Sequence, residues 1–291
     1  MSISLINLHP SPADLQQLVQ DGLKRSPRQL PAWLLYDAEG SRLFAEICRQ
    51  PEYTLTQREI ALLEDTATAI AAATGPGMVV EFGIGNARKV DPLLTALGSV
   101  VFAALDISLS ALKEALSGLA VRHPNTTMVG ICCDHTKLNK LPAHPAMERQ
   151  RRIGFFPGSS LGNFTAEDAV AFLRNARQLL AGGPLLLGLD QPREQALMEA
   201  AYDDAAGFSG GGATTSSLSI RSADSETLRL PIGTSPTTGS AGAAFGEPGG
   251  VSSGSLTSVI APTTNREQRQ QKKEKKKGTV LLLAPRDFEN F

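Results

Sequence analysis

A glycine-rich turn and two acidic residues stand where the sequence could bind a ligand. The segment EFGIGNARK, residues 81–89, follows an apolar run and precedes a helical pattern. Its glycines, Gly83 and Gly85, permit a tight turn and let a ligand approach the backbone. Asp106 and Asp134 each follow a further apolar run. The first carboxylate could accept two ribose hydroxyls and the second could reach an adenine amino group, so the pattern predicts an adenosine-binding site. A dinucleotide fingerprint needs a small residue where Arg88 stands, which argues against NAD.

The segment GFFPGSSLGNF, residues 154–164, permits two interpretations. Residues 158–162 match G-x-S-x-G, the nucleophile elbow of α/β-hydrolases, in which Ser160 would be the nucleophile. That fold places its histidine after the serine, whereas all four histidines of this chain precede Ser160. We therefore favour the second interpretation, in which the small residues let Asn163 approach a bound substrate.

All three tyrosines of the chain lie in segments that could belong to a site. Tyr36 lies in LLYDAEGSRLF, Tyr53 in PEYTLTQRE and Tyr202 in EAAYDDAAG. Any one of them could instead be a half-buried core residue, and only their association with the other motifs favours a site.

The elements that must position these residues alternate between strand and helix up to about residue 208. Helical patterns cover residues 13–23, 56–73, 88–97, 109–121 and 165–180, and another helix starts at Ser41. Short apolar strands are predicted at 78–82, 100–105, 127–133, 153–156 and 185–189, with a further one at 279–284. This alternation predicts an α/β fold with a mostly parallel sheet covered on both faces. Ligands bind at the carboxyl ends of such strands, where the glycine turn and the acids stand.

Composition narrows the functional classes. The chain has 291 residues, 42% hydrophobic content and a net charge of −1, so no overall field favours nucleic acid. Three cysteines provide no disulfide framework and form no metal-binding pattern, which fits the cytoplasm. No signal peptide and no membrane-spanning segment is expected. Residues 209–264 are rich in Ser, Thr, Gly, Ala and Pro, and a basic run follows, so we expect a flexible tail.

Five segments, YDAEGSRLF, PEYTLTQRE, EFGIGNARK, GFFPGSSLGNF and AYDDAAG, resemble in order and approximate spacing the L-histidine Nα-methyltransferase family, over about residues 28–208. That family uses S-adenosyl-L-methionine to trimethylate the α-amino group of L-histidine, giving hercynine, in ergothioneine biosynthesis. The resemblance implies a class I, Rossmann-like methyltransferase fold, and we expect a monomer. It implies an N-terminal helical substrate-binding portion (1–60) and a cofactor-binding domain (61–207), and the composition predicts a low-complexity tail (208–291) after them.

The resemblance also implies roles for individual residues. The residues around the cofactor would be Tyr36, Gly83, Lys89, Asp106, Asp134 and His135. Tyr53, Asn163 and Tyr202 would face the histidine, the last two at its amino and carboxylate groups. No metal and no separate catalytic residue is expected.

The chain departs from the family pattern in ways that affect its expected activity. Asn86 stands where Ser or Thr is usual, His135 replaces an aromatic residue, and Thr54-Leu55 replaces a Tyr-Pro pair. The Glu-x-Ser motif that grips the imidazole is not found after Gly207. We interpret the C-terminal part as divergent or frame-shifted and expect impaired histidine methylation. Two alternatives stay open: a methyltransferase of another amino acid or small amine, and a non-catalytic remnant that binds the cofactor.

Overall fold

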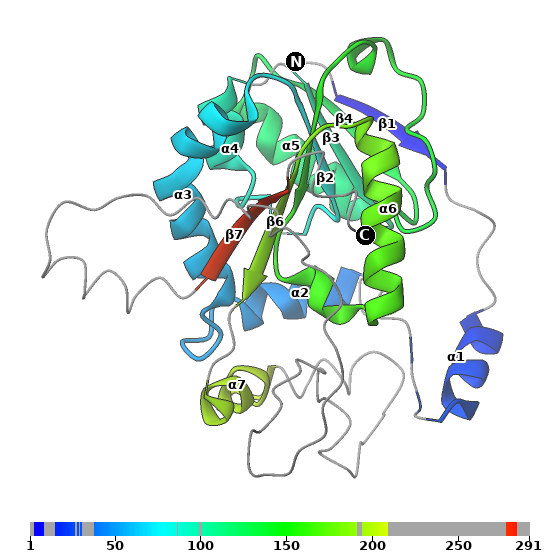
Figure 1. Cartoon of the computed structure of the whole chain (residues 1–291). Coiled ribbons are helices and arrows are strands. Elements are labelled where there is room, and N and C mark those ends of the chain that lie inside the picture. The colour runs from blue at the N-terminus through cyan, green and yellow to red at the C-terminus, as the bar shows by residue number, and fades with distance from the viewer. Residues whose placement is uncertain are drawn as a thin grey trace, which may run out of the picture.

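The computed structural model describes residues 3–8, 15–26, 28, 30, 38–85, 87–98, 101–190, 194–208 and 278–283. Within these residues seven strands form one sheet, in the order β1-β4-β3-β2-β5-β6-β7 (Figure 1). The strands are β1 (Ile3–Asn7), β2 (Met78–Phe82), β3 (Val101–Asp106), β4 (Thr127–Cys132), β5 (Arg152–Phe156), β6 (Leu185–Asp190) and β7 (Gly278–Leu283). Only β7 pairs antiparallel in this sheet, against β6. The expected α/β fold with a mostly parallel sheet is confirmed.

Helices cover both faces of the sheet (Figure 1). The described helices are α1 (Leu15–Lys24), α2 (Ala38–Ile47), α3 (Leu55–Thr74), α4 (Asp91–Leu97), α5 (Leu109–Arg122), α6 (Ala166–Leu180) and α7 (Gln195–Tyr202), with short 3-10 turns η2 (Pro145–Met147) and η3 (Ser160–Asn163). Side chains of successive residues in β2 pack on opposite faces of the sheet. Met78 and Val80 pack in the cluster that contains Phe172 of α6. Val79 packs in the cluster that contains Leu63 of α3 and Leu116 of α5.

Most expected elements lie within a few residues of their predicted bounds, and the differences have local causes. The helix expected from residue 88 begins only at Asp91, because residues 87–90 form a turn and Pro92 fits the first helical turn. The helix expected from Ser41 already begins at Ala38. Thr165 caps α6, since its hydroxyl accepts the Asp168 N–H at 3.1 Å. The strand expected near 279–284 is present as β7.

Two elements were not expected from the sequence. Strand β1 joins the sheet by pairing with β4, and α7 follows β6. Strand β1 precedes the predicted cofactor domain (61–207) in the sequence and β7 follows it, yet both belong to the same sheet.

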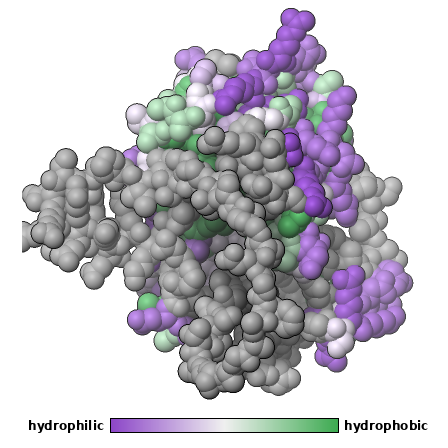
Figure 2. Space-filling model, viewed as in Figure 1, coloured by the Kyte–Doolittle hydropathy of each residue, from purple (hydrophilic) through white to green (hydrophobic). Residues whose placement is uncertain are grey.

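The surface of the described part is largely hydrophilic on the face shown in Figure 2, with small hydrophobic patches. No helix among the described residues is long and apolar enough to cross a bilayer. Tyr36, Asn86 and the predicted flexible stretch of the tail lie outside the described residues.

Candidate functional site

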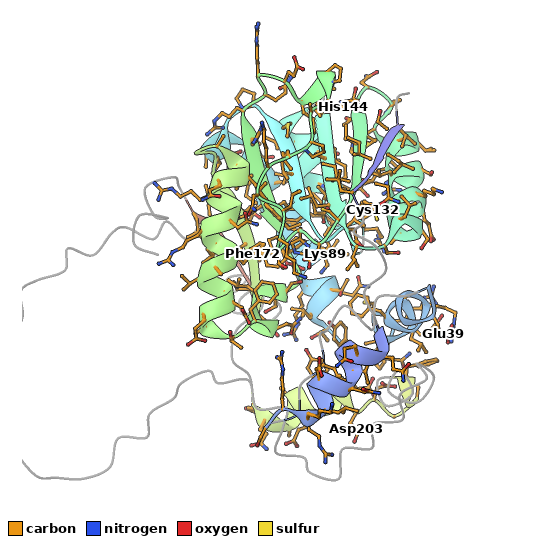
Figure 3. The ribbon with its side chains drawn as sticks, turned by 90° about the vertical axis from the view of Figure 1, so that its right-hand side faces the viewer. Glu39, Lys89, Cys132, His144, Phe172 and Asp203 are labelled. Carbon is orange, nitrogen blue, oxygen red and sulfur yellow. The ribbon has the colours of Figure 1, made fainter. Side chains whose placement is uncertain are left out.

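The predicted ligand-binding residues gather at the carboxyl ends of β2, β3 and β4. These strands are parallel neighbours, with Phe82 opposite Leu105 and Asp106 opposite Cys132. The Gly83 N–H donates to the Leu105 carbonyl at 2.7 Å, so the glycine turn begins beside the tip of β3. Figure 3 shows Lys89 at this lower edge of the sheet, Glu39 and Asp203 on elements beyond it, and His144 at the opposite end. The sequence therefore predicted correctly which edge of the sheet carries these residues.

The glycine turn and Asp106 form one hydrogen-bonded unit. Gly83 and Gly85 have φ angles of +79° and +37°, and no described atom lies within 4 Å of where a Cβ would stand at either position. One carboxylate oxygen of Asp106 accepts the Ile84 N–H at 2.9 Å, and the other accepts the Ser108 N–H at 2.8 Å. An ionised carboxylate has about four acceptor positions, so Asp106 can also receive ligand hydroxyls. The open backbone and the oriented carboxylate suit a ribose-containing ligand.

Glu81 is a buried carboxyl group next to the turn. It is 0% exposed, and its two carboxylate oxygens have no hydrogen-bond partner among the described residues. Burial raises the pKa of Glu81 well above its ordinary value, and the positive charge of Lys89 offsets only part of this effect. A buried polar group without a partner is costly, so its presence at the head of the turn marks this place as functionally constrained.

Asp134 and His135 follow the tip of β4 and differ in their surroundings. Asp134 accepts hydrogen bonds from the Thr136 hydroxyl at 2.6 Å and pairs with Lys137 at 2.9 Å. Burial opposes ionisation of Asp134, but these contacts outweigh it and lower the pKa of its carboxyl group. The His135 ring lies 5.9 Å from the Phe172 ring, and burial lowers the pKa of the imidazole.

Aromatic side chains surround His135 on the α6 side of the sheet. Its ring centroid lies 6.1 Å from those of Phe82 and Phe156. Its Nε2 atom is buried and has no hydrogen-bond partner within the described part of the chain. His135 thus packs inside an aromatic cluster and brings one polar atom into it.

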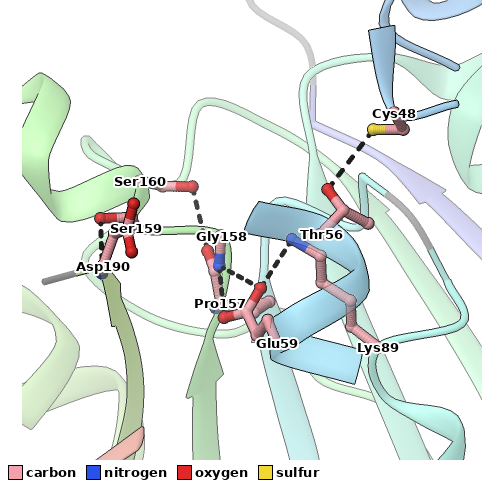
Figure 4. Close-up of polar contacts among 9 residues, drawn as sticks. All are labelled: Cys48, Thr56, Glu59, Lys89, Pro157, Gly158, Ser159, Ser160 and Asp190. Atoms are coloured by element: carbon pink, nitrogen blue, oxygen red, sulfur yellow. Dashed lines mark hydrogen bonds and ion pairs between the residues drawn. The ribbon is translucent and has the colours of Figure 1, made fainter. Parts of the chain in front are cut away.

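Lys89 forms a buried ion pair that the sequence did not predict. Its Nζ lies 2.8 Å from the Glu59 carboxylate, and both residues are 6% exposed. Glu59 belongs to α3, and its carboxylate also accepts the backbone N–H of Gly158 (Figure 4). One feature of the sequence could have predicted that Glu59 is buried and paired. Glu59 lies on the same helical stripe as the buried residues Thr56 and Leu63, where a charged residue requires a partner.

The segment after β5 forms a tight turn rather than a nucleophile elbow. The left-handed residue is Ser159, with φ of 57°, whereas Ser160 starts η3 and donates its hydroxyl to the Pro157 carbonyl at 3.0 Å. A nucleophile elbow would place the reactive serine itself at the strained position. Asn163 ends η3 and is exposed, so its amide is accessible.

Tyr53 and Tyr202 lie side by side although they are far apart in the sequence. Their ring centroids are 6.1 Å apart in an edge-to-face arrangement, and Phe44 of α2 contacts Tyr53 in the same way. Tyr53 is buried, and this burial raises the pKa of its hydroxyl; Tyr202, at the end of α7, is 60% exposed. The structure thus brings together two of the three predicted substrate residues, and Phe44 is a neighbour that sequence reasoning missed.

Comparison with known proteins extends the resemblance to most of the chain. The model of a family described as "Histidine-specific methyltransferase, SAM-dependent" matches residues 15–210. The histidine N-alpha-methyltransferase of Mycolicibacterium smegmatis is 34% identical over 216 residues, covering 71% of this chain and 66% of the relative. Ergothioneine biosynthesis protein 1 of Schizosaccharomyces pombe is 34% identical over 198 residues, covering 64% of this chain and 25% of the relative.

Among solved structures, the glycopeptide N-methyltransferase MtfA in complex with sinefungin is similar, with 26% identity and a TM-score of 0.34. The match covers 45% of this chain and 55% of that protein. The chain spans less than two thirds of the length of the two curated relatives named above.

Proposed function

Because this chain belongs to the histidine-specific, S-adenosylmethionine-dependent methyltransferase family, we propose that it transfers methyl groups from S-adenosyl-L-methionine to the α-amino group of L-histidine. The product would be trimethylhistidine (hercynine). The observation that carries the proposal is the unit formed by the open glycine backbone at Gly83 and the oriented carboxylate of Asp106, next to buried Lys89. The free, buried cysteines fit a reducing compartment, so we place the reaction in the cytoplasm.

The residues at the strand tips fit the proposed cofactor. Asp106 would hold the ribose hydroxyls, while the backbone of Gly83 leaves room for the cofactor to approach. Lys89 is paired with Glu59, but its ammonium group has three donors and one of them could reach the cofactor carboxylate. Asp134 with His135 would border the adenine. Tyr36 is proposed as a further contact on the grounds of the family resemblance alone.

The amino-acid side of the site would be formed by Tyr53, Asn163 and Tyr202. Asn163 and Tyr202 can offer amide and hydroxyl groups to the carboxylate and amine of an amino acid. Such contacts determine which nitrogen faces the reaction centre, and orientation of this kind can supply about 7–11 kcal/mol of the barrier reduction. The amine must lose its proton before it can attack, either to water or to a nearby acceptor.

When bound, S-adenosyl-L-methionine supplies an electrophilic methyl group on a sulfonium centre. The described residues therefore act by binding and orienting the two reactants.

The test combines binding and turnover. Calorimetry should detect S-adenosylhomocysteine binding, and an assay with a panel of amino acids, read by mass spectrometry, should find methyl transfer to the α-amino group of L-histidine. If a different amino acid is methylated and L-histidine is not, that amino acid is the substrate and the proposal for histidine is wrong. Cofactor binding without any transfer would identify a non-catalytic remnant, and absence of binding would refute the proposal.

A further inference from the structure

One carboxylate, that of Glu59, connects three segments that are distant in the sequence. Its Oε2 lies 2.8 Å from Lys89 Nζ, in the turn that precedes α4. Both of its oxygens lie within hydrogen-bond distance of the Gly158 N–H, at 2.8 and 3.0 Å, at the tip of β5 (Figure 4). Glu59 itself is on the helix that begins directly after Tyr53. The proposed cofactor side and both substrate segments therefore meet at one side chain.

The neighbouring strand leaves space for this carboxylate. A Cβ atom placed on Gly188 of β6 would lie 1.8 Å from Glu59 Oε1, so only glycine fits opposite the carboxylate. The same strand holds the turn from its other side: the Ser159 N–H donates to the Gly188 carbonyl at 3.0 Å, and the Asp190 N–H donates to Ser159 Oγ at 3.1 Å. The turn at residues 157–163 is thus fixed between β6 and Glu59.

The backbone of this turn needs such support. Gly158 has φ of +84°, and Ser159 adopts the left-handed conformation, which is unfavourable for a non-glycine residue. Strained conformations persist only where surrounding contacts hold them. A buried ion pair is in general no better for stability than well-packed apolar residues, so stability alone does not explain Glu59 and Lys89.

We propose that Glu59 is a positioning residue for the amino-acid half of the site, an inference that rests on the proposed function. Glu59 holds the Gly158 N–H and so sets where Asn163, at the end of the turn, lies relative to the helix that follows Tyr53. Lys89 Nζ pairs with the same carboxylate at 2.8 Å and keeps it directed at the turn. Small displacements of a substrate-orienting group can reduce rates by up to about a hundredfold.

The first experiment separates positioning from stability with two double variants. E59Q/K89M removes both charges but keeps an acceptor for the Gly158 N–H, whereas E59M/K89M removes the acceptor as well. Replacing both members of a buried pair tends to preserve folding, so both proteins should fold. Amide hydrogen exchange over residues 158–163 should be about tenfold faster or more in E59M/K89M than in E59Q/K89M. Equal exchange in the two proteins would overturn the proposal.

The second experiment measures the effect on substrate. In E59Q only the amide oxygen accepts hydrogen bonds, in place of two carboxylate oxygens, and the charge that pairs with Lys89 is lost. The turn should then hold Asn163 less firmly and weaken its hydrogen bonds to the amino acid, so the KM for L-histidine should rise by about tenfold or more. E64Q is the matched control, because Glu64 is exposed on the same helix, and its KM should equal that of the wild type.

An added methyl group at Gly188 tests the packing of the Glu59 carboxylate from the side of β6. In G188A the added Cβ meets Glu59 Oε1 at 1.8 Å and Pro157 Cα of the turn at 3.0 Å, so it should displace both the carboxylate and the turn and raise the KM as E59Q does. In G118A the added Cβ meets only the end of Arg122 at 3.4 Å, and the KM should not change.

The outcomes distinguish this inference from the proposed function. If the wild-type chain neither binds S-adenosylhomocysteine nor methylates an amino acid, the proposed function fails and the inference with it. If the wild type is active and E59Q and G188A leave the KM for histidine unchanged, the inference alone is refuted. A raised KM in both variants with faster exchange of the turn supports it.

Discussion

Removal of the Asp106 carboxylate should weaken cofactor binding by an amount that follows from its contacts. Two of its acceptor positions are used by the Ile84 and Ser108 N–H groups, at 2.9 and 2.8 Å. The remaining positions are available to ligand hydroxyls, and a hydrogen bond to a charged group contributes about 1.5–3 kcal/mol. Asp106→Ala should therefore reduce the affinity for S-adenosylhomocysteine by roughly tenfold to a hundredfold.

Asp106→Ala also removes the acceptor that orients the glycine turn, so a control for general destabilisation is needed. Ser108 caps α5 by accepting the Ala111 N–H at 3.2 Å, and Ser108→Ala should cost about 1 kcal/mol of folding stability without removing a ligand contact. Calorimetric titration of the wild type and both variants, with thermal unfolding in parallel, should show lost affinity only for Asp106→Ala. An unchanged affinity in Asp106→Ala, or an equal loss in Ser108→Ala, would refute the assignment of the ribose site.

Three further predictions concern the groups around the site and the helix behind it. Burial lowers the pKa of His135, so below about pH 6.5 the unfolded chain takes up a proton that the folded protein resists. The free energy of unfolding therefore falls as the pH falls. In urea unfolding, His135→Phe should make the free energy of unfolding depend less on pH. Burial raises the pKa of Glu81, so above about pH 4.5 the unfolded chain releases a proton that the folded protein retains. Its contribution to stability then decreases as the pH rises, and Glu81→Gln should raise the melting temperature at neutral pH; a lower value would contradict the burial argument. Thr165→Ala should cost about 1 kcal/mol through loss of the α6 cap, whereas Thr165→Ser should retain it, as denaturant midpoints can check.

Several features of the fold could be predicted because their signals are local. Strand β2 and its neighbours are short apolar runs with turn residues at their ends, and they are buried on both faces as that pattern predicts. The placement of Gly83 beside Asp106 followed from the rule that parallel strands end at the same edge of the sheet. Strand β1 was missed because ISLIN is a short edge segment, and its partner β4 lies far along the chain.

The amino-acid sequence by itself determined the fold class, the strand tips that carry the polar residues, and the motifs that identify the family. Only the tertiary structure decided which of those residues meet. Glu59 and Gly158 are 99 residues apart, and their contact depends on how α3 docks against β5 and β6. The contact between Tyr53 and Tyr202 likewise requires α7 to pack beside α2. Local propensity and periodicity describe residues a few positions apart, whereas these contacts arise from burial of apolar faces by segments that the sequence keeps distant.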